Sequence, residues 1–462
     1  HRGEADVDSG VLPQRIETMK LHVKATAAVA IVGGTLGTSP RTLAAAQDTL
    51  TLADAYDAAI SNDPRAAEFE LLERSLDLRL RNLGTEWLPS LSVAAEAQHQ
   101  SEVTSFEIPI PGVEPPRPPK DRYQATLNVD QLVYEGGALS ARGDVARAEA
   151  ARDEAELAAR LYDLRTEVDA AYFAVLDLQE RGAELALLAT DLEARLAEAR
   201  EQVAGGVALP GEAAALEAEL LEARQQRREL EARRAAALAV LEDLAGAALP
   251  DDARLALPAL SDRVAATAAA LGEREPAGRT ITHPELARLE AERALLEERG
   301  DLIETEALPR VSAFGQAGYG RPGLDMFGDQ PDTWWLAGVR LRWTPWEWNA
   351  RDRERARLEL RQGALDAERR AFLDRLERAV ADERALIDAL RAGLATGRRI
   401  VALREQIEAQ QLARLREGVI LPSVYVDART DVTEARVALR RRRVEIARLQ
   451  AQYLTMLGVR VR

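Results

Sequence analysis

Gly206-Val207-Ala208-Leu209-Pro210 returns near the end of the chain as Gly418-Val419-Ile420-Leu421-Pro422. In each copy another glycine follows 40 positions after the first one, Gly246 in one copy and Gly458 in the other. A glycine followed closely by a proline is typical of a turn between two helices. The chain is therefore predicted to contain the same helical hairpin twice.

Upstream of these turns the two copies keep the same spacing. Asn62-Asp63-Pro64 is matched by Thr282-His283-Pro284, and in each copy a Leu-Pro step follows with its proline 25 positions after the first. One interval differs, because Pro89 to Tyr134 spans 45 positions whereas Pro309 to Trp346 spans 37. Insertions are tolerated in loops and not in packed elements, so the difference marks a loop inside a duplicated unit. We expect a first repeat at 47–246, a linker segment at 247–282 and a second repeat at 283–462.

The composition favours long helices over a compact enzyme core. Of the 462 residues, 47% are hydrophobic but 4% aromatic, and 30% are charged. The apolar residues are largely Ala and Leu and the charged ones largely Arg and Glu, a mixture typical of long helices. The chain has no cysteine, which excludes disulfides and thiolate metal sites. The net charge of −16 argues against nucleic-acid binding, which needs a basic face.

Residues 1–46 are predicted to be an N-terminal extension and a secretory signal peptide. Met19 is followed by Lys20 and Lys24, then by an apolar run at 25–36 and by Ala44-Ala45-Ala46. A basic start, a short hydrophobic stretch and small residues at the exit are typical of such a signal. The run of about 12 residues is too short to cross a bilayer of about 30 Å as a helix. The mature chain is expected to begin near residue 47; a floppy N-terminal tail is the alternative.

Periodicity predicts long helices in both copies. From residue 138 to about 204 no proline interrupts a pattern whose apolar positions step by four and three, as at Leu157, Leu161 and Leu164. This period near 3.5 is that of a coiled-coil seam. At 1.5 Å per residue the helix is about 100 Å long, which predicts a rod or a tube. Further helices are expected at 52–86, 210–244, 349–417 and 423–457.

Between the helices, alternating polar and apolar residues predict two β-hairpins. Strands are expected at about 90–100 and 122–133, and again at about 310–320 and 333–344. Strands of about 10 residues with one apolar face suit the wall of a membrane β-barrel. A half-buried hairpin on a soluble core would show the same pattern. Four strands cannot close a barrel and open edges are not tolerated in lipid, so several copies would have to pool their strands.

Four stretches carry a resemblance to a known family: Leu50–Ala55 with Asn62-Asp63-Pro64, Trp87–Leu91, Asp130–Gly137 and Glu167–Phe173. In this order, and with the duplication, the chain from about 50 to 458 resembles the TolC-like outer-membrane efflux protein family of Gram-negative bacteria. The resemblance implies a mostly α fold with a pair of β-hairpins, in which a duplicated helix–hairpin–long helix–helix unit builds a trimeric 12-stranded β-barrel continued by an α-helical barrel. The segment 247–282 would then be an equatorial linker.

The resemblance also implies a function and partners. The chain would be an outer-membrane channel subunit, spanning into the periplasm, that exports small molecules or secreted proteins. Its partners would be two further copies of itself, a periplasmic adaptor (membrane fusion protein), an inner-membrane transporter and outer-membrane lipid. The alternative is a periplasmic coiled-coil adaptor or scaffold without a channel. An adaptor has one hairpin flanked by compact β domains, and a scaffold leaves the alternating strands unexplained.

Three groups of residues receive roles from the resemblance. The two turns would be periplasmic tips that dock the adaptor, although glycine also caps helices irrespective of partners; they comprise Gly206, Val207, Ala208, Leu209, Gly418, Val419, Ile420 and Leu421. A periplasmic aperture is expected at Asp427 and Asp431, one helical turn apart, while a solvated helix face explains them equally well. Val424 stands at one of the positions where the family usually has an acid, which leaves open whether the acidic ring is complete. In the barrel lumen we expect Asp130, Arg340 and Arg342, with the arginines either pairing across the wall with Asp130 or Glu96, or tuning the passage of anions.

No pattern indicates an enzyme, a cofactor or a metal. The four histidines are scattered along the chain, and two of them lie in the N-terminal segment. Residues 318–323 match G-x-G-x-x-G, but Pro322 interrupts the motif and no helix follows, so a hairpin loop is expected there.

Overall fold

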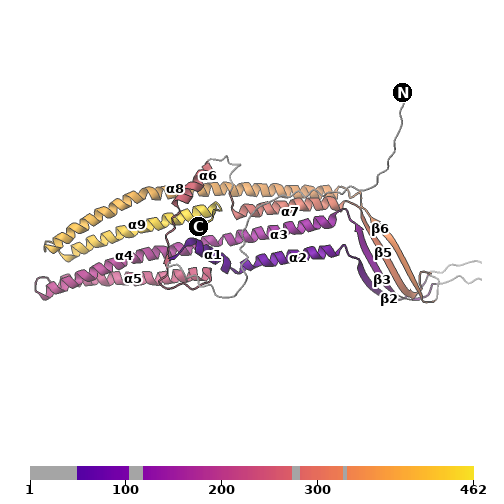
Figure 1. The fold of residues 1–462 in the computed structure, drawn as a ribbon, viewed down its shortest axis with the longest axis horizontal. Helices are drawn as coiled ribbons and strands as arrows, with labels where there is room; N and C mark the ends of the chain where they lie inside the picture. Colours follow the sequence, from indigo (N-terminus) through magenta and orange to yellow (C-terminus); the bar gives the residue numbers. More distant parts are fainter. Residues whose placement is uncertain (1–48, 104–117, 273–280, 326–329, 462) are drawn as a thin grey trace, which may run out of the picture. The chain divides into compact units, whose positions relative to one another are not determined.

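The computed structural model describes residues 49–103, 118–272, 281–325 and 330–461 (Figure 1). The expectation for residues 1–46 lies outside these ranges, as do parts of both expected hairpin loops. The first repeat contains β1 (Thr49–Leu50), α1 (Leu52–Asn62), the 3-10 helix η1 (Pro64–Ala67), α2 (Glu68–Thr85), β2 (Ser90–His99), β3 (Asp121–Tyr134), α3 (Ala138–Tyr162), α4 (Leu164–Ala204) and α5 (Pro210–Ala245).

The second part of the chain repeats the order of helix, hairpin, long helix and helix. It contains β4 (Arg254–Leu255), α6 (Ser261–Gly272), α7 (Pro284–Glu306), β5 (Arg310–Arg321), β6 (Asp332–Arg342), α8 (Ala350–Arg416) and α9 (Pro422–Met456). The expectation of a mostly helical fold with a pair of hairpins is confirmed. The β1–β4 ladder, which is parallel and two residues long in each strand, was not expected.

Two predicted helices are interrupted. The segment 52–86 is divided at Asp63, which is extended (φ −62°, ψ 125°) because the next residue is Pro64, and whose side chain caps η1. The segment 138–204, expected to be uninterrupted, is divided at Asp163. This residue keeps helical angles (φ −64°, ψ −25°), and its carbonyl oxygen accepts a bond from Thr166 N at 3.0 Å. The interruption is thus a local tightening to i+3 bonding, for which no proline or glycine is needed.

The landmarks of each repeat lie against each other. Nδ2 of Asn62 donates to two carbonyl oxygens at the end of α5, at 3.2 and 3.3 Å, and a Cβ on Gly246 (φ +65°) would lie 1.9 Å from Asn62 Oδ1. In the second copy Gly458 (φ +76°) lies against Thr282, whose hydroxyl donates to the Gly458 carbonyl oxygen at 3.2 Å. Only glycine fits such a position, where φ is positive and a neighbour is close. The end of each repeat therefore packs against residues near its beginning, which explains the equal spacing in the sequence.

The four longer strands form one antiparallel sheet in the order β2-β3-β5-β6. The two hairpins, one from each repeat, meet at the β3–β5 pair, where Thr126 lies opposite Gly318. The register also places Ala94 beside Thr126 and Trp334 beside Gly318, so these four residues share one face. β2 and β6 are left as the two edges of the sheet.

The helices continue from the sheet in packed pairs (Figure 1). Nearer the sheet, α2 packs on α3, α3 on α7, and α7 on the first half of α8. Farther from it, α5 packs on α4, α4 on α9, and α9 on the second half of α8. In both layers a helix of the first repeat meets one of the second in the middle. The outermost helices are α2 and α5 on one side and α8 on the other.

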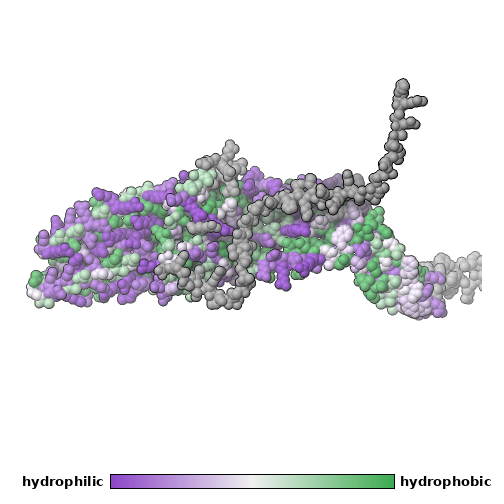
Figure 2. Space-filling model, viewed as in Figure 1, coloured by the Kyte–Doolittle hydropathy of each residue, from purple (hydrophilic) through white to green (hydrophobic). Residues whose placement is uncertain are grey.

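The largest buried core joins α4 and α9 to the short elements around them. Val168, Tyr172 and Leu176 of α4 and Leu454 of α9 are buried against α1, β4 and α6. The hydroxyl oxygen of Tyr172 lies 2.9 and 2.6 Å from the carbonyl oxygens of Leu50 and Ala256, which fastens the β1–β4 ladder to α4. Figure 2 shows a mainly hydrophilic surface on the helices and a largely hydrophobic one on the sheet.

Candidate functional site

The turns at residues 206–210 and 418–422 have the same backbone geometry. Gly206 (φ +74°) and Gly418 (φ +70°) are left-handed, and the following residue in each turn donates its N–H to a carbonyl five residues back, Val207 to Gln202 and Val419 to Arg414, both at 2.9 Å. This pairing is the Schellman motif, which closes a helix before a sharp turn. The next helix starts in each case with a proline at its first position, where a missing N–H costs nothing.

Both turns expose apolar side chains. Val207 and Leu209 are 83% and 69% exposed, and Val419 and Leu421 are 68% and 58% exposed. Ile420 instead packs against the core beneath the turns, which is built from α4, α5 and α9. Figure 1 shows the two turns at the same end of the helices, away from the sheet. Each turn therefore presents two apolar side chains to solvent at this end of the helices.

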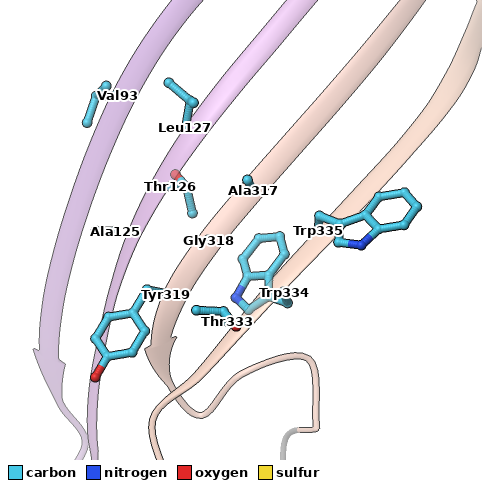
Figure 3. Close-up of a pocket in the computed structure, with 10 residues that line it drawn as sticks. All are labelled: Val93, Ala125, Thr126, Leu127, Ala317, Gly318, Tyr319, Thr333, Trp334 and Trp335. Atoms are coloured by element: carbon cyan, nitrogen blue, oxygen red, sulfur yellow. The ribbon is translucent and has the colours of Figure 1, made fainter.

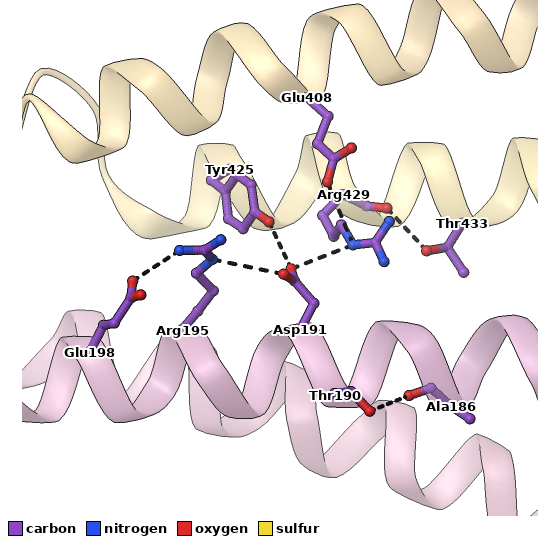
Figure 4. Close-up of polar contacts among 9 residues, drawn as sticks. All are labelled: Ala186, Thr190, Asp191, Arg195, Glu198, Glu408, Tyr425, Arg429 and Thr433. Atoms are coloured by element: carbon purple, nitrogen blue, oxygen red, sulfur yellow. Dashed lines mark hydrogen bonds and ion pairs between the residues drawn. The ribbon is translucent and has the colours of Figure 1, made fainter.

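A polar cluster ties the two helical hairpins together near these turns (Figure 4). Asp191 of α4 accepts a hydrogen bond from the Tyr425 hydroxyl of α9 at 2.7 Å. The same carboxylate lies 3.4 Å from Nε of Arg429, and 3.8 Å from Nε of Arg195. Arg429 Nε also lies 3.6 Å from a carboxylate oxygen of Glu408 in α8. We call Asp191, Arg195, Glu408, Tyr425 and Arg429 the clamp.

The clamp is largely shielded from water. Tyr425 is 1% exposed and Arg429 is 8% exposed. Burial, and then the neighbouring Asp191, raise the pKa of Tyr425 to about 12, so its hydroxyl keeps its proton and donates at neutral pH. A hydrogen bond to a charged acceptor contributes about 2 kcal/mol. The clamp therefore holds α8 and α9 against α4 with one hydrogen bond to a carboxylate and several ion pairs.

The clamp was not predicted from the sequence, because its members are up to 238 positions apart (191 to 429). Two signals were present. Tyr425 and Arg429 are four residues apart and so share a face of α9. Asp191 places a charge three positions after Leu188 and next to Leu192, two buried residues of the α4 seam. A charge at seam spacing indicates a specific partner on the facing helix.

The two residues expected at an aperture have different surroundings. Asp427 is exposed on α9. Burial, and then the nearby carboxylates of Glu222 and Asp427, raise the pKa of Glu219 in α5. Asp431 is half-buried and forms an ion pair with Arg404 of α8. Part of the negative charge expected there is therefore neutralised by an arginine. Val424, which stands where an acidic residue was expected from the resemblance, is 41% exposed.

At the other end, the sheet has one apolar and one polar face. The apolar face is exposed along its length and carries Leu91, Val93, Tyr123, Leu127, Tyr319, Trp335, Val339 and Leu341. The polar face carries, among others, Ser92, Gln124, Asn128, Asp130, Gln316 and Arg340. Figure 3 shows the neighbours Trp334 and Trp335 directed away from each other, around a hollow of about 470 Å³.

Of the expected lumen residues, the structure brings two together. Arg340 of β6 and Asp130 of β3 are separated by the strand β5. Arg340 Nη1 lies 3.6 Å from Asp130 Oδ1, so the expected pairing of these residues is present. The Arg340 guanidinium also lies over the ring of Phe314, 4.7 Å from its centre, an arrangement that favours the cation. Arg342 is exposed at the end of β6. Phe314 and Trp334 show that this face also carries aromatic rings, which the alternation pattern did not indicate.

Neither a metal site nor a membrane-crossing helix is found among the residues that the structure describes. No group of three or more His, Cys, Asp or Glu side chains within these ranges is arranged to hold a metal ion. Among the helices described, none combines the length and the apolar character that crossing a membrane requires.

Comparison with known proteins gives a family and a fold. Residues 55–247 match the model of the family described as outer membrane efflux protein. No curated protein sequence matches the chain. Three solved structures share its fold at low sequence identity. The CmeC outer membrane channel of Campylobacter jejuni has 15% identity and a TM-score of 0.59, and the match covers 93% of this chain and 91% of that one.

The other two are similar. The MtrE outer membrane channel of Neisseria gonorrhoeae, in its open state, has 16% identity and a TM-score of 0.60, with 89% of each chain covered. The outer membrane protein VceC of Vibrio cholerae has 17% identity and a TM-score of 0.55, with 89% of this chain and 97% of that one covered. At these identities the likeness concerns the fold, and it extends over both repeats.

Proposed function

We propose that three copies of this chain form an export channel. The chain belongs with the outer membrane efflux proteins, through the family match of residues 55–247 and the fold that it shares with solved outer-membrane channels, and this membership supports the proposal. The channel lies in the outer membrane and extends into the periplasm. It would carry small molecules or secreted proteins outward. A periplasmic adaptor or scaffold without a channel is not favoured, because it leaves the two-faced sheet without a role.

The observation that carries this proposal is the sheet with one largely exposed apolar face. Val93, Trp335 and Val339 are 77%, 75% and 71% exposed on that face. Contact of such apolar side chains with water is unfavourable. Soluble proteins rarely leave a continuous apolar surface of this kind uncovered. Lipid is the occupant that fits it, while the polar face, with its paired Asp130 and Arg340, would line an aqueous passage.

The edges of the sheet support assembly from copies of this chain. Among the described residues, β2 and β6 each have one side without a strand partner, and the order β2-β3-β5-β6 is antiparallel throughout. β6 of one copy and β2 of the next therefore run in opposite directions and can pair as neighbouring strands do. Three copies of a four-stranded sheet would give 12 strands, enough for a closed barrel without exposed edges.

The outermost helices would meet in the same order. The free side of α8 carries an apolar stripe, with Ile400, Leu403 and Ile407 each at least 42% exposed. On the opposite side of the subunit, α5 exposes Leu221 (56%) and Val240 (55%). α8 contains 16 arginines and 12 acidic residues, whereas α5 contains 8 acidic residues and 5 arginines. Exposed apolar residues on two helices of opposite net charge fit a head-to-tail ring, in which α8 of one copy lies beside α5 of the next.

At the other end of the helices, the tips and the clamp would control access. The exposed apolar residues of the two turns would dock a periplasmic adaptor, which connects the channel to an inner-membrane transporter. The clamp holds the α8–α9 hairpin against the α4–α5 hairpin just beside these turns. Moving one hairpin relative to the other would require breaking the contacts of Asp191. In this proposal the clamp keeps the passage narrow until the adaptor docks.

One experiment tests the channel itself. The protein is extracted from outer membranes in mild detergent, its mass is measured by light scattering, and it is reconstituted into a planar lipid bilayer. We expect a trimer that conducts ions. A soluble monomer, or a membrane-bound trimer that leaves the bilayer non-conducting, would refute the proposal.

The tips have a separate test. Gly206→Trp and Gly418→Trp place a bulky side chain where φ is positive and nothing lies within 4 Å, so strain of about 1–2 kcal/mol distorts the turn without a clash. We expect a stable trimer that conducts alone but no longer supports export in cells. Gly300→Trp, in α7 and likewise with no neighbour within 4 Å, is the control. Normal export by both tip variants would remove the docking role.

The clamp also has a direct test. Tyr425→Phe removes the hydroxyl that donates to Asp191 and costs the clamp about 2 kcal/mol. We expect higher single-channel conductance, or a larger open fraction, in planar bilayers. Tyr453→Phe is the matched control, because Tyr453 is a tyrosine of the same helix with 1% exposure that takes no part in the clamp. Identical conductance in wild type and Tyr425→Phe would show that the clamp does not restrict the passage.

A further inference from the structure

A hollow of about 560 Å³ lies between α4, α8 and α9, roughly midway along the helices and outside both the tips and the sheet. Its volume is in the range of small-molecule sites. Its apolar lining consists of Ala170, Phe173, Ala174, Leu390, Ala438 and Val444. Its charged lining consists of Asp177, Arg441, Arg442, Glu445 and Arg448.

The hollow opens on a side of α4 and α9 that is bare of the other short elements that the structure describes, β1, β4 and α6. On α4, Tyr172 is directed toward β1 and β4, and Ala170 and Ala174, two positions away on either side, lie about 160° from it around the helix. On α9, Gln450 contacts Ser261 of α6 at 3.3 Å, and Arg441, nine positions earlier, lies about 180° away. In the proposed channel this bare side faces the passage, because the elements on the opposite side would otherwise fill it.

The charges of the hollow favour an anion. Three guanidinium groups face two carboxylates. Arg448 forms an ion pair with Glu445 at 2.5 Å, Arg441 lies 3.5 Å from Asp177, and Arg442 Nη1 donates to the Gly393 carbonyl oxygen at 2.9 Å. Each guanidinium has five N–H donors, so these contacts leave donors free on all three.

The glycines of α8 hold one of these arginines in place. A Cβ on Gly393 would lie 3.1 Å from Arg442 Nη1, so the absence of a side chain there lets the arginine approach the helix backbone. A guanidinium fixed in this way loses little freedom when it binds a ligand. The hydrogen bond from Arg448 lowers the pKa of Glu445, so this carboxylate stays charged as the partner of Arg448, while burial raises the pKa of Glu383 on α8.

We propose that the hollow binds amphipathic anions, with the apolar body of the ligand against Phe173 and Leu390 and its anionic group at Arg441, Arg442 and Arg448. The site would be a contact for cargo on the inner wall of the channel, between the clamp and the sheet. Its position in the passage rests on the proposed function. The binding itself does not, and it can be measured on the isolated protein.

The test uses two probes with the same rings and different charge. 1-Naphthalenesulfonate and neutral 1-naphthalenemethanol are titrated into the purified, full-length protein in non-ionic detergent by calorimetry, with detergent alone as the blank. We expect saturable binding of the sulfonate, about tenfold tighter than that of the alcohol. Arg441→Gln should weaken sulfonate binding about fivefold to tenfold and leave the alcohol unchanged, since it removes a charge-assisted contact. Ala174→Leu, which fills the hollow, should weaken both probes.

Arg443→Gln is the matched control. Arg443 belongs to the same run of four arginines, is exposed, and does not line the hollow. Equal binding of the two probes, or an equal loss in Arg441→Gln and Arg443→Gln, would overturn the proposal. Specific sulfonate binding to a protein that does not conduct would leave the hollow in place and refute the channel. Conductance without specific binding would refute the anion site and leave the channel in place.

Discussion

At the scale of single residues, the buried group with the clearest consequence is Asp169 of α4. It is 1% exposed and accepts a hydrogen bond from the Tyr56 hydroxyl of α1. The Arg165 guanidinium lies nearby, between the rings of Tyr56 and Tyr162. Burial raises the pKa of Asp169 to about 6, against its ordinary value of 3.8. The protonated form is therefore favoured by folding.

The direction of the pH effect follows from that shift. Because the folded pKa lies above the unfolded one, the contribution of Asp169 to stability is complete below about pH 4 and is lost as the pH rises through about 6. Asp169→Asn removes this titration, and we expect it to gain on the order of 2 kcal/mol over wild type between pH 4 and pH 7.5. Thermal unfolding followed by circular dichroism at both pH values measures the difference. Parallel behaviour of the two proteins would contradict the expectation.

At the scale of elements, periodicity predicted most of the helices and strands. Helices such as α8 and strands such as β3 have repeated apolar positions over many residues, and that repetition is a local signal. The β1–β4 ladder has two residues per strand and therefore no period to detect. The division at Asp163 was missed because its backbone stays helical. The clamp was missed because it depends on how distant helices pack.

The sheet gives a prediction at this scale. Val339 is 71% exposed on the apolar face, and a lysine facing lipid near the middle of a barrel strand costs about 2–4 kcal/mol. We expect Val339→Lys to reduce the amount of heat-resistant trimer recovered from outer membranes. Gln124→Lys, on the polar face, should be tolerated, as a residue that faces water would be. If both variants assembled equally well, the apolar face would not be the lipid-facing one.

At the scale of the whole molecule, the two helical hairpins differ in charge although their elements follow the same order. α8 and α9 together contain 23 arginines and 16 acidic residues, whereas α4 and α5 contain 9 arginines and 17 acidic residues. In a ring, hairpins of net positive and net negative charge alternate. Each hairpin then has a neighbour of opposite sign on both sides, within the subunit and between subunits. Pairing of like hairpins is disfavoured.

Salt dependence of assembly follows from this alternation. Exposed charges are screened over about 10 Å at 0.1 M salt and over about 4–5 Å at 0.5 M. We therefore expect the temperature at which the trimer dissociates, measured on semi-native gels, to fall by several degrees between about 50 and about 500 mM NaCl. Reversal of the net charge of α8 by substituting its exposed arginines with glutamate should lower it further. A dissociation temperature that rises with salt would show that apolar contacts dominate the interface.

The contact of Gly246 with Asn62, and of Gly458 with Thr282, has a meaning for the history of the gene. Each repeat carries both halves of the contact that joins its end to its start. A tandem copy of such a segment would carry a complete set of internal restraints, and no contact would have to be exchanged between copies. The two copies could then diverge in surface charge, one toward arginine and one toward glutamate, without losing the geometry that they inherited.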